Sequence, residues 1–268
     1  MDALEYANNI VLPDTRVAVC GDWHGNIGWV RTLAKALPSL APTVTTVLQL
    51  GDWWMDPAAD VLLADAGIER VYVTLGNHEP WGDITPLLDA RPGHAVRVSD
   101  ITWLLPRPAR LSIGGRTVLS LGGAASVDKT WRQEAVSWFP QEEITADHVA
   151  AAVAGGPADL MLTHESPART PVRAVQEVLR TNPMGFPDDA LADSLLSRRR
   201  VAKVWDLIHP ALLVHGHMHA PGGGQTDDGR RVASLGRDTQ QGALALLDMF
   251  TLTMDTPSLR QIRDAAGM

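Results

Sequence analysis

The chain has 268 residues, of which 45% are hydrophobic, so it can bury a sizeable core in one large domain or two small ones. Its formal net charge of −8 disfavours a broad surface for nucleic acid or anionic membranes, because such surfaces are normally basic. Its one cysteine, Cys20, excludes an internal disulfide, and its place at the end of an apolar run favours a buried side chain over a nucleophile.

Two further features predict the compartment. The first residues, MDALEYANNIVLPDTR, lack the basic region that precedes the apolar stretch of a signal peptide. No stretch of about 18 apolar residues is present, so no transmembrane helix is expected. We therefore expect a soluble, cytoplasmic protein that does not bind membranes.

Strands that alternate with short helices are predicted in the first part of the chain. The strands are expected at 15–20, 44–50 and 70–75. Between them, an amphipathic helix over 27–37 is expected to end at Pro38, and a second helix is expected over 57–66. This alternation predicts a mainly parallel sheet, in which ligands bind beyond the carboxyl ends of the strands.

The second part of the chain mixes strands and helices differently. A hairpin turn is expected at Gly114-Gly115, and a helix over 141–154 is expected to end at Gly155. Further helices are expected at 171–180 and 190–207. Further strands are expected at 95–105, 109–113, 117–121, 159–162 and 211–214, followed by antiparallel strands at 231–235 and 243–254.

These elements predict a single α/β domain over residues 1–268, with two stacked sheets flanked by helices. The chain contains no internal repeat, no low-complexity tract and no convincing linker. The Pro-rich segment 166–200 interrupts the pattern of strands. It is interpreted either as a lid or cap that sets substrate specificity or as a peripheral pair of helices.

Five short clusters at the ends of predicted strands carry side chains that bind metals. The clusters are GDWHGN (21–26), GDWW (51–54), GNHEPW (76–81), THESP (163–167) and HGHMH (215–219). Nitrogen and oxygen ligands without thiolate suit manganese, iron, zinc, nickel or cobalt better than calcium or magnesium. Two such cations that share a carboxylate are a general device for attacking phosphate esters. The candidate ligands are Asp22, His24, Asp52, Asn77, His164, His217 and His219.

Local geometry supports this interpretation of the clusters. Gly25 allows a tight turn, so Asp22 and His24 can face one cavity. His217 and His219 are separated by one residue, and in an extended chain they would point to the same side. Taken singly, most of the clusters are ordinary turns, so the interpretation depends on their joint occurrence in this order.

The order D-x-H, GD, GNH[DE], H, GHxH resembles the calcineurin-like metallophosphoesterase superfamily, and it spans residues 22–219. The resemblance implies a four-layer αββα sandwich of two mixed β-sheets flanked by helices. It assigns the first metal to Asp22, His24, Asp52 and His219. It assigns the second metal to Asp52, Asn77, His164 and His217, with Asp52 as the bridge. His78 corresponds to the catalytic histidine of the family, near the leaving-group oxygen.

The same resemblance implies the chemistry. Two divalent cations, with manganese expected first and iron, zinc, nickel or cobalt as alternatives, lower the pKa of a bridging water from about 15.7 to near 7. The resulting hydroxide attacks a phosphomonoester or phosphodiester in a small substrate. Protonated His78 then donates to the departing oxygen.

One departure from the family narrows the subclass. Ser/Thr protein phosphatases and dinucleoside tetraphosphate hydrolases carry an arginine after the second motif, as in GDxxDRG, whereas this chain has GDWWMDP. The segment 122–145 looks like one found in uncharacterised bacterial and phage members. The resemblance therefore implies an activity class without a substrate.

Weaker signals concern the substrate and the surroundings of the metals. Six of the nine tryptophans lie in the motifs or in the loop after the hairpin: Trp23, Trp53, Trp54, Trp81, Trp131 and Trp138. They could stack a nucleobase, making a nucleotide one candidate substrate, or could pack loops onto the sheets. Arg132 and Asn77 are candidate substrate contacts; for Arg132, a salt bridge to Asp128 or Glu134 is the alternative. Glu79 is expected to orient a neighbouring imidazole or to be solvated, and His215 to support a ligand from outside the centre or to be structural.

Two other functions compete with the small-molecule phosphoesterase. A nuclease that acts on short or single-stranded nucleic acid would use the same metals, although the acidic charge disfavours it. A non-catalytic scaffold with this fold is the other alternative. Such scaffolds tend to lose metal ligands or the catalytic histidine, and here all of these positions are intact.

Overall fold

Buried side chains alternate along the central strands, and this alternation sets the layers of the fold. In β3 (Arg16–Cys20), Val17 and Val19 belong to one core cluster, whereas Ala18 and Cys20 belong to another. The first cluster fills the space between the two sheets, and the second lies under helices. A strand that is buried on both faces must therefore lie between two layers. The computed structural model describes residues 2–54 and 57–268.

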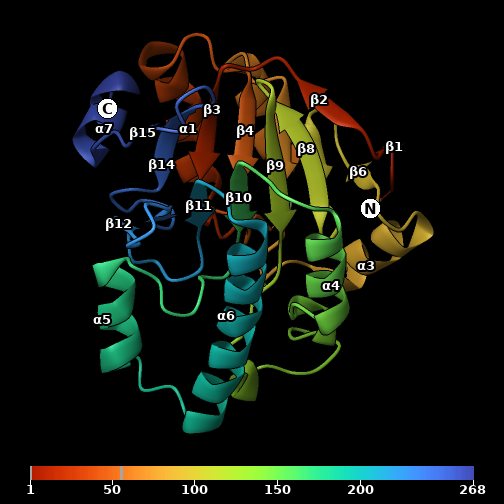
Figure 1. Cartoon of the computed structure of the whole chain (residues 1–268). Coiled ribbons are helices and arrows are strands. Elements are labelled where there is room, and N and C mark those ends of the chain that lie inside the picture. The colour runs from red at the N-terminus through yellow and green to blue at the C-terminus, as the bar shows by residue number, and fades with distance from the viewer. Residues whose placement is uncertain (1, 55–56) are drawn as a thin grey trace.

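Two mixed sheets pack face to face in the middle of the molecule (Figure 1). The first sheet has the order β1 (Glu5–Ala7), β6 (Ala95–Arg97), β7 (Thr102–Leu104), β5 (Arg70–Val73), β4 (Thr46–Gln49), β3, β14 (Leu244–Asp248) and β15 (Met254–Asp255). The second has the order β12 (Gly222–Gln225), β13 (Arg231–Ser234), β11 (Leu212–His215), β10 (Leu160–Thr163), β9 (Arg116–Leu121), β8 (Ala109–Ile113) and β2 (Ile10–Leu12).

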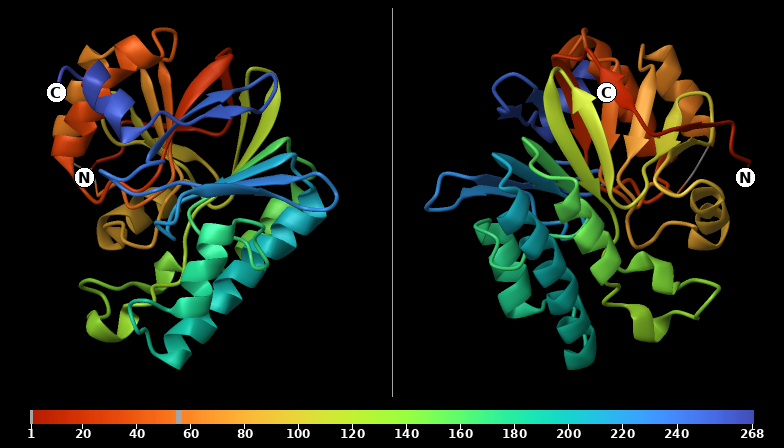
Figure 2. Two further views of the ribbon diagram at one scale, coloured as in Figure 1. Left: turned by 90° about the vertical axis from the view of Figure 1, so that its left-hand side faces the viewer. Right: turned by 45° about the vertical axis from the view of Figure 1, so that its right-hand side comes forward.

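Helices cover the outer face of each sheet (Figure 2). The first sheet is covered by α1 (Ile27–Leu40), α2 (Pro57–Asp65) and α7 (Leu259–Ala265), with α3 (Trp81–Ala90) nearby. The second is covered by α4 (Ala146–Ala154), α5 (Arg173–Thr181) and α6 (Asp188–Ile208). The four-layer α/β sandwich expected from the sequence is confirmed. Within the described residues, every helix is too short or too polar to cross a membrane.

Parallel strands bring their carboxyl ends to one edge in each sheet. In the first sheet, β3, β4 and β5 run parallel to one another. In the second sheet, β9, β10, β11 and β13 are parallel neighbours. The loops that follow these strands carry the sequence clusters, so the fold collects the clusters at one place.

Several predicted element boundaries were wrong. Helix α1 continues through Pro38 to Leu40, because the proline lies in the last turn and the buried face of the helix holds it in place. The single strand expected at 95–105 is two antiparallel strands, β6 and β7. The helix expected from 141 begins at Ala146, after the short 3₁₀ turn η2 (Pro140–Glu142).

Two more expectations at the carboxyl-terminal side need correction. The strands expected at 231–235 and 243–254 lie in different sheets, where β13 pairs antiparallel with β12 and β14 pairs antiparallel with β3. The second of these strands also breaks into β14 and β15. The local pattern did not predict several short or edge elements at all. These are β1, β2, β12, α3 and α7.

The start of α4 is held by a capping box that depends on protonation. The Thr145 side chain accepts a hydrogen bond from the His148 backbone N–H at 3.2 Å, and His148 Nδ1 accepts one from the Thr145 N–H at 3.1 Å. Burial, helped by the charge of Arg107, lowers the pKa of His148 from 6.5 to about 4. The imidazole therefore stays neutral and keeps its acceptor nitrogen.

We expect this histidine to make the folded state sensitive to acid. Between about pH 6.5 and 4 the unfolded chain binds a proton at His148 and the folded chain does not, so this contribution to stability is lost as pH falls. His148→Gln retains a capping acceptor and cannot titrate, so its free energy of unfolding should fall less over this range. Urea denaturation at several pH values measures this, with His94→Gln as the control. An equal fall in wild type and His148→Gln would contradict it.

Candidate metal centre

The structure brings together the side chains of all seven candidate ligands that were predicted from the sequence. Each of them lies in a loop that follows a parallel strand: Asp22 and His24 after β3, Asp52 after β4, Asn77 after β5, His164 after β10, and His217 and His219 after β11. Both sheets therefore contribute to one cluster. This cluster is called the candidate metal centre below.

One group of donor atoms lies at the β3 side of the centre. Atoms of Asp22, His24 and His219 all lie within 4.8 Å of one another. Asp22 Oδ2 is 2.9 Å from His219 Nε2, and the rings of His24 and His219 are 5.0 Å apart. One carboxylate and two imidazoles at this spacing could hold a divalent cation.

A second group lies deeper, between the sheets. Donor atoms of Asp22, Asp52 and His164 lie within 4.8 Å of one another, and all three side chains are buried. His164 Nε2 is 2.9 Å from Asn77 Oδ1 and 3.5 Å from Asp52 Oδ1. The His217 ring lies 4.9 Å from the His164 ring. These atoms form a second potential ligand set beside the first.

Two carboxylates connect the groups. Asp22 belongs to both by distance. Asp52 faces both as well, because its Oδ2 is 3.7 Å from His24 Nε2 while its Oδ1 is 3.5 Å from His164 Nε2. Either carboxylate is positioned to serve two cations.

The loops reach this geometry through left-handed backbone. His24, Asp52, His217 and His219 have φ angles of 47°, 53°, 63° and 49°. This conformation is uncommon outside glycine and costs on the order of 1–3 kcal/mol per residue. The extended conformation expected for His217 and His219 was wrong, because a turn follows β11. Both residues nevertheless reach the same cluster.

Glycines make room for the close approach of these loops. A Cβ at Gly51 would lie 2.5 Å from His164 Nδ1 and 2.6 Å from the backbone nitrogen of Gly76. A Cβ at Gly216 would collide with Asp22 Oδ1. The Gly-Asp and Gly-His pairs of the sequence therefore have a packing role at the junction of the two sheets.

Opposite charges govern the titration of the buried groups. Burial alone would raise the pKa of Asp22, but His164, His219 and His24 outweigh burial and hold that pKa well below its usual range. Burial would lower the pKa of His164, but Asp52 and Asp22 raise it. Burial and the charge of His164 keep the pKa of His217 well below its ordinary value, so its imidazole is neutral and available as a ligand.

The donor set fits divalent cations. His164 Nδ1 donates to Leu50 O at 2.5 Å, so Nε2 is the nitrogen that faces the oxygens of Asn77 and Asp52. Most side chains of this cluster direct an oxygen or an unprotonated imidazole nitrogen towards its centre. A divalent cation bound there would coordinate these atoms. In the part of the chain that the structure describes, no lysine or arginine pairs with Asp22 or Asp52.

His78 lies beside the centre and is about one-third exposed. Its backbone N–H donates to Asp52 Oδ1 at 2.9 Å, and its Nε2 lies 3.8 Å from Asp128 Oδ2. Burial lowers the pKa of His78, although Asp52 and Asp128 oppose the shift. Asp128 belongs to the loop after β9, and sequence reasoning did not assign it to the site.

Asp238, after β13, is a second residue that sequence reasoning missed. Its Oδ1 lies 3.0 Å from His24 Nδ1, its Oδ2 accepts from Asn26 Nδ2 at 2.6 Å, and its backbone N–H donates to Asp22 O at 2.7 Å. His24 thus keeps Nε2 free for a metal. A carboxylate on the outer nitrogen of a metal-binding histidine fixes the ring and its tautomer.

Glu79 and His215 are both buried close to the centre. Glu79 accepts hydrogen bonds from the backbone N–H groups of Trp53, Trp54 and Gly76, so it orients loops and not an imidazole. Burial and the nearby Asp52 raise the pKa of Glu79 to about 7. His215 donates from Nδ1 to Gly216 O at 2.9 Å, and burial lowers its pKa to about 4.

Arg132 forms contacts within its own loop. Its Nη2 is 2.7 Å from Glu142 Oε1, its Nη1 is 2.8 Å from Ser126 Oγ, and Asp128 lies 3.5 Å away. Ser126 in turn accepts a hydrogen bond from Asn77 Nδ2 at 2.9 Å. Arg132 is therefore linked to a candidate ligand through one hydroxyl.

Comparison with known proteins agrees with this geometry. The sequence model of the calcineurin-like phosphoesterases matches residues 15–221, which is more than half of the chain. The chain belongs to the calcineurin-like phosphoesterase family. A comparison with curated proteins finds no match.

Several solved structures share the fold at low sequence identity. TT1561 of Thermus thermophilus has a TM-score of 0.55 at 13% identity, with 92% of this chain and 99% of that one covered. A dimetal phosphatase from Danio rerio has a TM-score of 0.53 at 12% identity, with 96% and 97% covered. GAP50, described as the anchor in the inner membrane complex of Plasmodium, has a TM-score of 0.50 at 13% identity, with 91% and 84% covered.

Membership makes this chain a metallophosphoesterase, a hydrolase of phosphoric esters. The family uses a dinuclear divalent metal centre. The two groups of Asp and His side chains described above are where this chain could bind the metals.

We expect Asp238 to control metal binding through His24. Asp238→Asn removes the charge that orients the imidazole, so metal affinity should fall about 10- to 100-fold. Metal-buffered titration calorimetry measures the change, with Asp227→Asn in the exposed β12–β13 turn as the control. Equal affinities for the wild type and Asp238→Asn would show that His24 needs no such partner.

Proposed function

We propose that this metallophosphoesterase hydrolyses a phosphomonoester or phosphodiester bond in a small molecule, using two divalent cations at the candidate metal centre. The observation that carries the proposal is the burial of Asp22 and Asp52 beside three imidazoles and Asn77 at the junction of both sheets. Such a concentration of donor groups has no other charge partner among the described side chains.

The roles proposed for the ligands follow the geometry. Asp22, His24 and His219 would hold one cation, and Asn77, His164 and His217 the other. Asp52 would be shared, since it has one oxygen towards each group. Bound there, the cations would offset the charge of the phosphate and activate water for attack. Manganese is our first candidate, and iron, zinc, nickel or cobalt would also suit these ligands.

His78 is proposed as the residue that assists the leaving group. It is partly exposed at the edge of the centre, so a substrate oxygen can reach it. Asp128, 3.8 Å from Nε2, would stabilise positive charge on the ring while His78 donates a proton. Burial lowers the pKa of His78, and the charges of Asp52 and Asp128 oppose that shift.

Trp54 supports a substrate with an aromatic part, such as a nucleotide. Its side chain is 44% exposed, whereas Trp23, Trp53 and Trp81 are buried in the core. The Trp54 ring lies 5.6 Å from the His24 ring and 6.4 Å from the His78 ring. An exposed indole between a candidate ligand and the candidate acid offers a flat surface for a base.

Residues 166–200 are proposed to cover this entrance as part of the single domain. They form α5 and the first half of α6, which project beyond the sheets (Figure 2). Phe186, in the loop between these helices, packs against Trp131 with ring centres 5.6 Å apart. Trp131 belongs to the same 3₁₀ turn as Lys129, next to Asp128. Through this contact, a substrate bound near His78 could change the position of residues 166–200.

Two alternatives remain as outcomes of experiment. A nuclease would need basic groups for an extended strand, and the net charge of −8 disfavours this. A non-catalytic scaffold with this fold is the other alternative, and GAP50, which shares the fold, is described as an anchor. The complete set of candidate ligands and His78 favours catalysis over that role.

The central experiment reconstitutes metal-free protein. We expect manganese, nickel, zinc, cobalt or iron to restore hydrolysis of p-nitrophenyl phosphate or bis(p-nitrophenyl) phosphate, because each can occupy the nitrogen and oxygen ligands. The ratio of the two rates distinguishes a monoesterase from a diesterase. No turnover with any metal, on these esters and on a nucleotide panel, would favour the scaffold.

A matched variant accompanies the reconstitution. His78→Ala should reduce kcat by about 10²- to 10⁴-fold and leave the metal content unchanged, since general acid help is worth this much. Metal content is measured by plasma emission spectroscopy on the same samples. Unchanged turnover in His78→Ala would remove this histidine from the mechanism.

The aromatic surface is tested separately. Trp54→Ala should raise KM about tenfold for nucleoside monophosphates, because base stacking is lost, and leave KM for glycerol phosphate nearly unchanged. Trp54→Phe, which retains an aromatic face, should restore most of the affinity. Equal effects on both substrates would show that Trp54 only supports the loop.

A further inference from the structure

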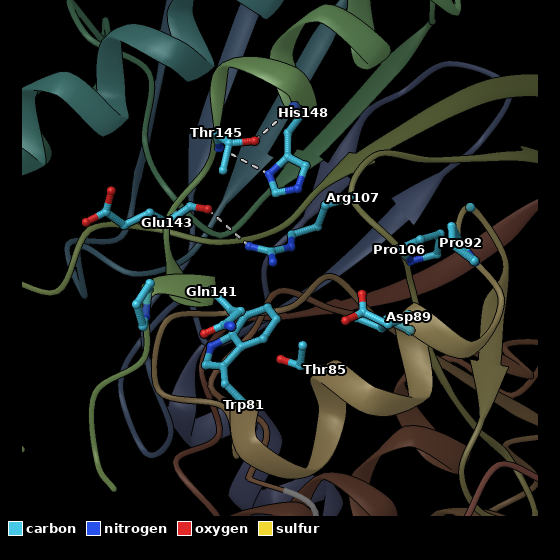
Figure 3. Close-up of a pocket in the computed structure, with 13 residues that line it drawn as sticks. Trp81, Thr85, Asp89, Pro92, Pro106, Arg107, Gln141, Glu143, Thr145 and His148 are labelled. Atoms are coloured by element: carbon cyan, nitrogen blue, oxygen red, sulfur yellow. Dashed lines mark hydrogen bonds between the residues drawn. The ribbon is translucent and has the colours of Figure 1, made fainter. Parts of the chain in front are cut away.

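A second pocket lies between α3 and the start of α4, apart from the candidate metal centre (Figure 3). Its volume is about 450 Å³, within the range of about 300–1,000 Å³ that suits small molecules. None of its lining residues is a candidate ligand. It adjoins the loop that carries His78, because Trp81, the first residue of α3 after that loop, lines the pocket.

Arg107 projects into the middle of this pocket (Figure 3). Its Nη1 donates to Glu143 O at 3.3 Å, and its guanidinium lies 4.3 Å from the centre of the Trp81 ring. No carboxylate of the described residues lies within ion-pair distance of it. Burial lowers the pKa of Arg107 to about 10, so it remains charged at neutral pH. A largely buried cation with one carbonyl partner is costly unless an anion joins it.

Three other donors line the same pocket. His148 Nδ1 accepts from the Thr145 N–H, so the ring proton is on Nε2, the nitrogen turned towards Arg107 in Figure 3. The Thr85 hydroxyl and the Trp81 indole N–H are buried and have no partner among the described residues. Buried polar groups are nearly always hydrogen-bonded, so unpartnered donors that line a pocket indicate a missing acceptor.

The acidic side chains of the pocket form no ion pair with Arg107 among the described residues, although the charge of Asp89 raises the pKa of Arg107 against the effect of burial. The Glu143 carboxylate turns away (Figure 3) and lies 3.8 Å from Arg200 Nη1. Asp89 lies at the other side of the pocket and forms no ion pair with Arg107 among the described contacts. The Asp89 carboxylate could accept a hydrogen bond from a hydroxyl group of a molecule bound in the pocket.

We propose that this pocket binds the phosphate group of a small hydroxylated molecule, with Arg107 and His148 as its main contacts. Donors of four kinds line the pocket from α3, α4 and the segment after β7, and phosphate has more acceptor oxygens for them than a carboxylate has. Arginine pairs with phosphate through two parallel hydrogen bonds. Thr85 adds a third contact from α3. The proposal does not depend on metal at the other site.

Inorganic phosphate is the probe, titrated by calorimetry into zinc-loaded protein. Zinc is diamagnetic, so the indole N–H signal of Trp81 can be followed by NMR in parallel. We expect two binding events in the wild type, one at the metals and one that shifts the Trp81 signal. Arg107→Met should lose the second event, and Arg91→Met should retain both, because Arg91 stacks on Tyr6 and does not line the pocket.

A second variant guards against misfolding of Arg107→Met. Thr85→Val keeps the side-chain volume and removes only an unpartnered hydroxyl, so it should fold normally and weaken the second event by about tenfold. An unchanged second event in both variants would overturn the proposal. Malonate that binds the pocket more tightly than phosphate would overturn the assignment to phosphate.

Discussion

Two carboxylates, Asp22 and Asp52, are buried together where the carboxyl ends of the strands of both sheets meet. The rest of the structure depends on how their negative charge is stabilised. Negative charge taken out of water is costly unless it is paired. Here the partners are the imidazoles of His24, His164 and His219, each with a nitrogen near a carboxylate oxygen. Divalent cations would neutralise the negative charge that these imidazoles leave unbalanced. This connects the chemistry of the family to the two-sheet architecture.

The backbone around these groups is strained, and contacts both within and outside the motifs hold it in place. Asp52 is left-handed at φ 53°, and its carbonyl accepts from the His24 N–H at 2.7 Å. Glu79 holds the neighbouring loops through three backbone N–H groups, and Asp238 holds His24. Strained residues persist when their surroundings over-determine them. These contacts hold the candidate ligands in place, which is what a preorganised site requires.

The secondary structure was predictable where a local pattern dominated. Apolar runs followed by Gly-Asp or Gly-Asn located β3, β4 and β5, because a buried strand must be apolar on both faces. Predictions failed where packing overrides local preference. Pro38 did not end α1, since its buried face holds the last turn. The strand expected at 95–105 turned back on itself to pair β6 with β7. Short edge strands such as β1 and β12 carry too few residues for a periodic pattern.

The sequence by itself determined the family, the layered fold and the seven candidate ligands, because these depend on short motifs and on the period of buried residues. Only the tertiary structure decided what surrounds them. Asp238 meets His24 across 214 residues of chain, and no spacing rule connects two such positions. Asp128 reaches His78 and Arg107 faces Thr85 in the same way, through the packing of separate elements. A local sequence pattern predicts which residues follow a strand. How closely distant loops approach is determined by strand pairing and by the glycines at the junction, which lack a Cβ.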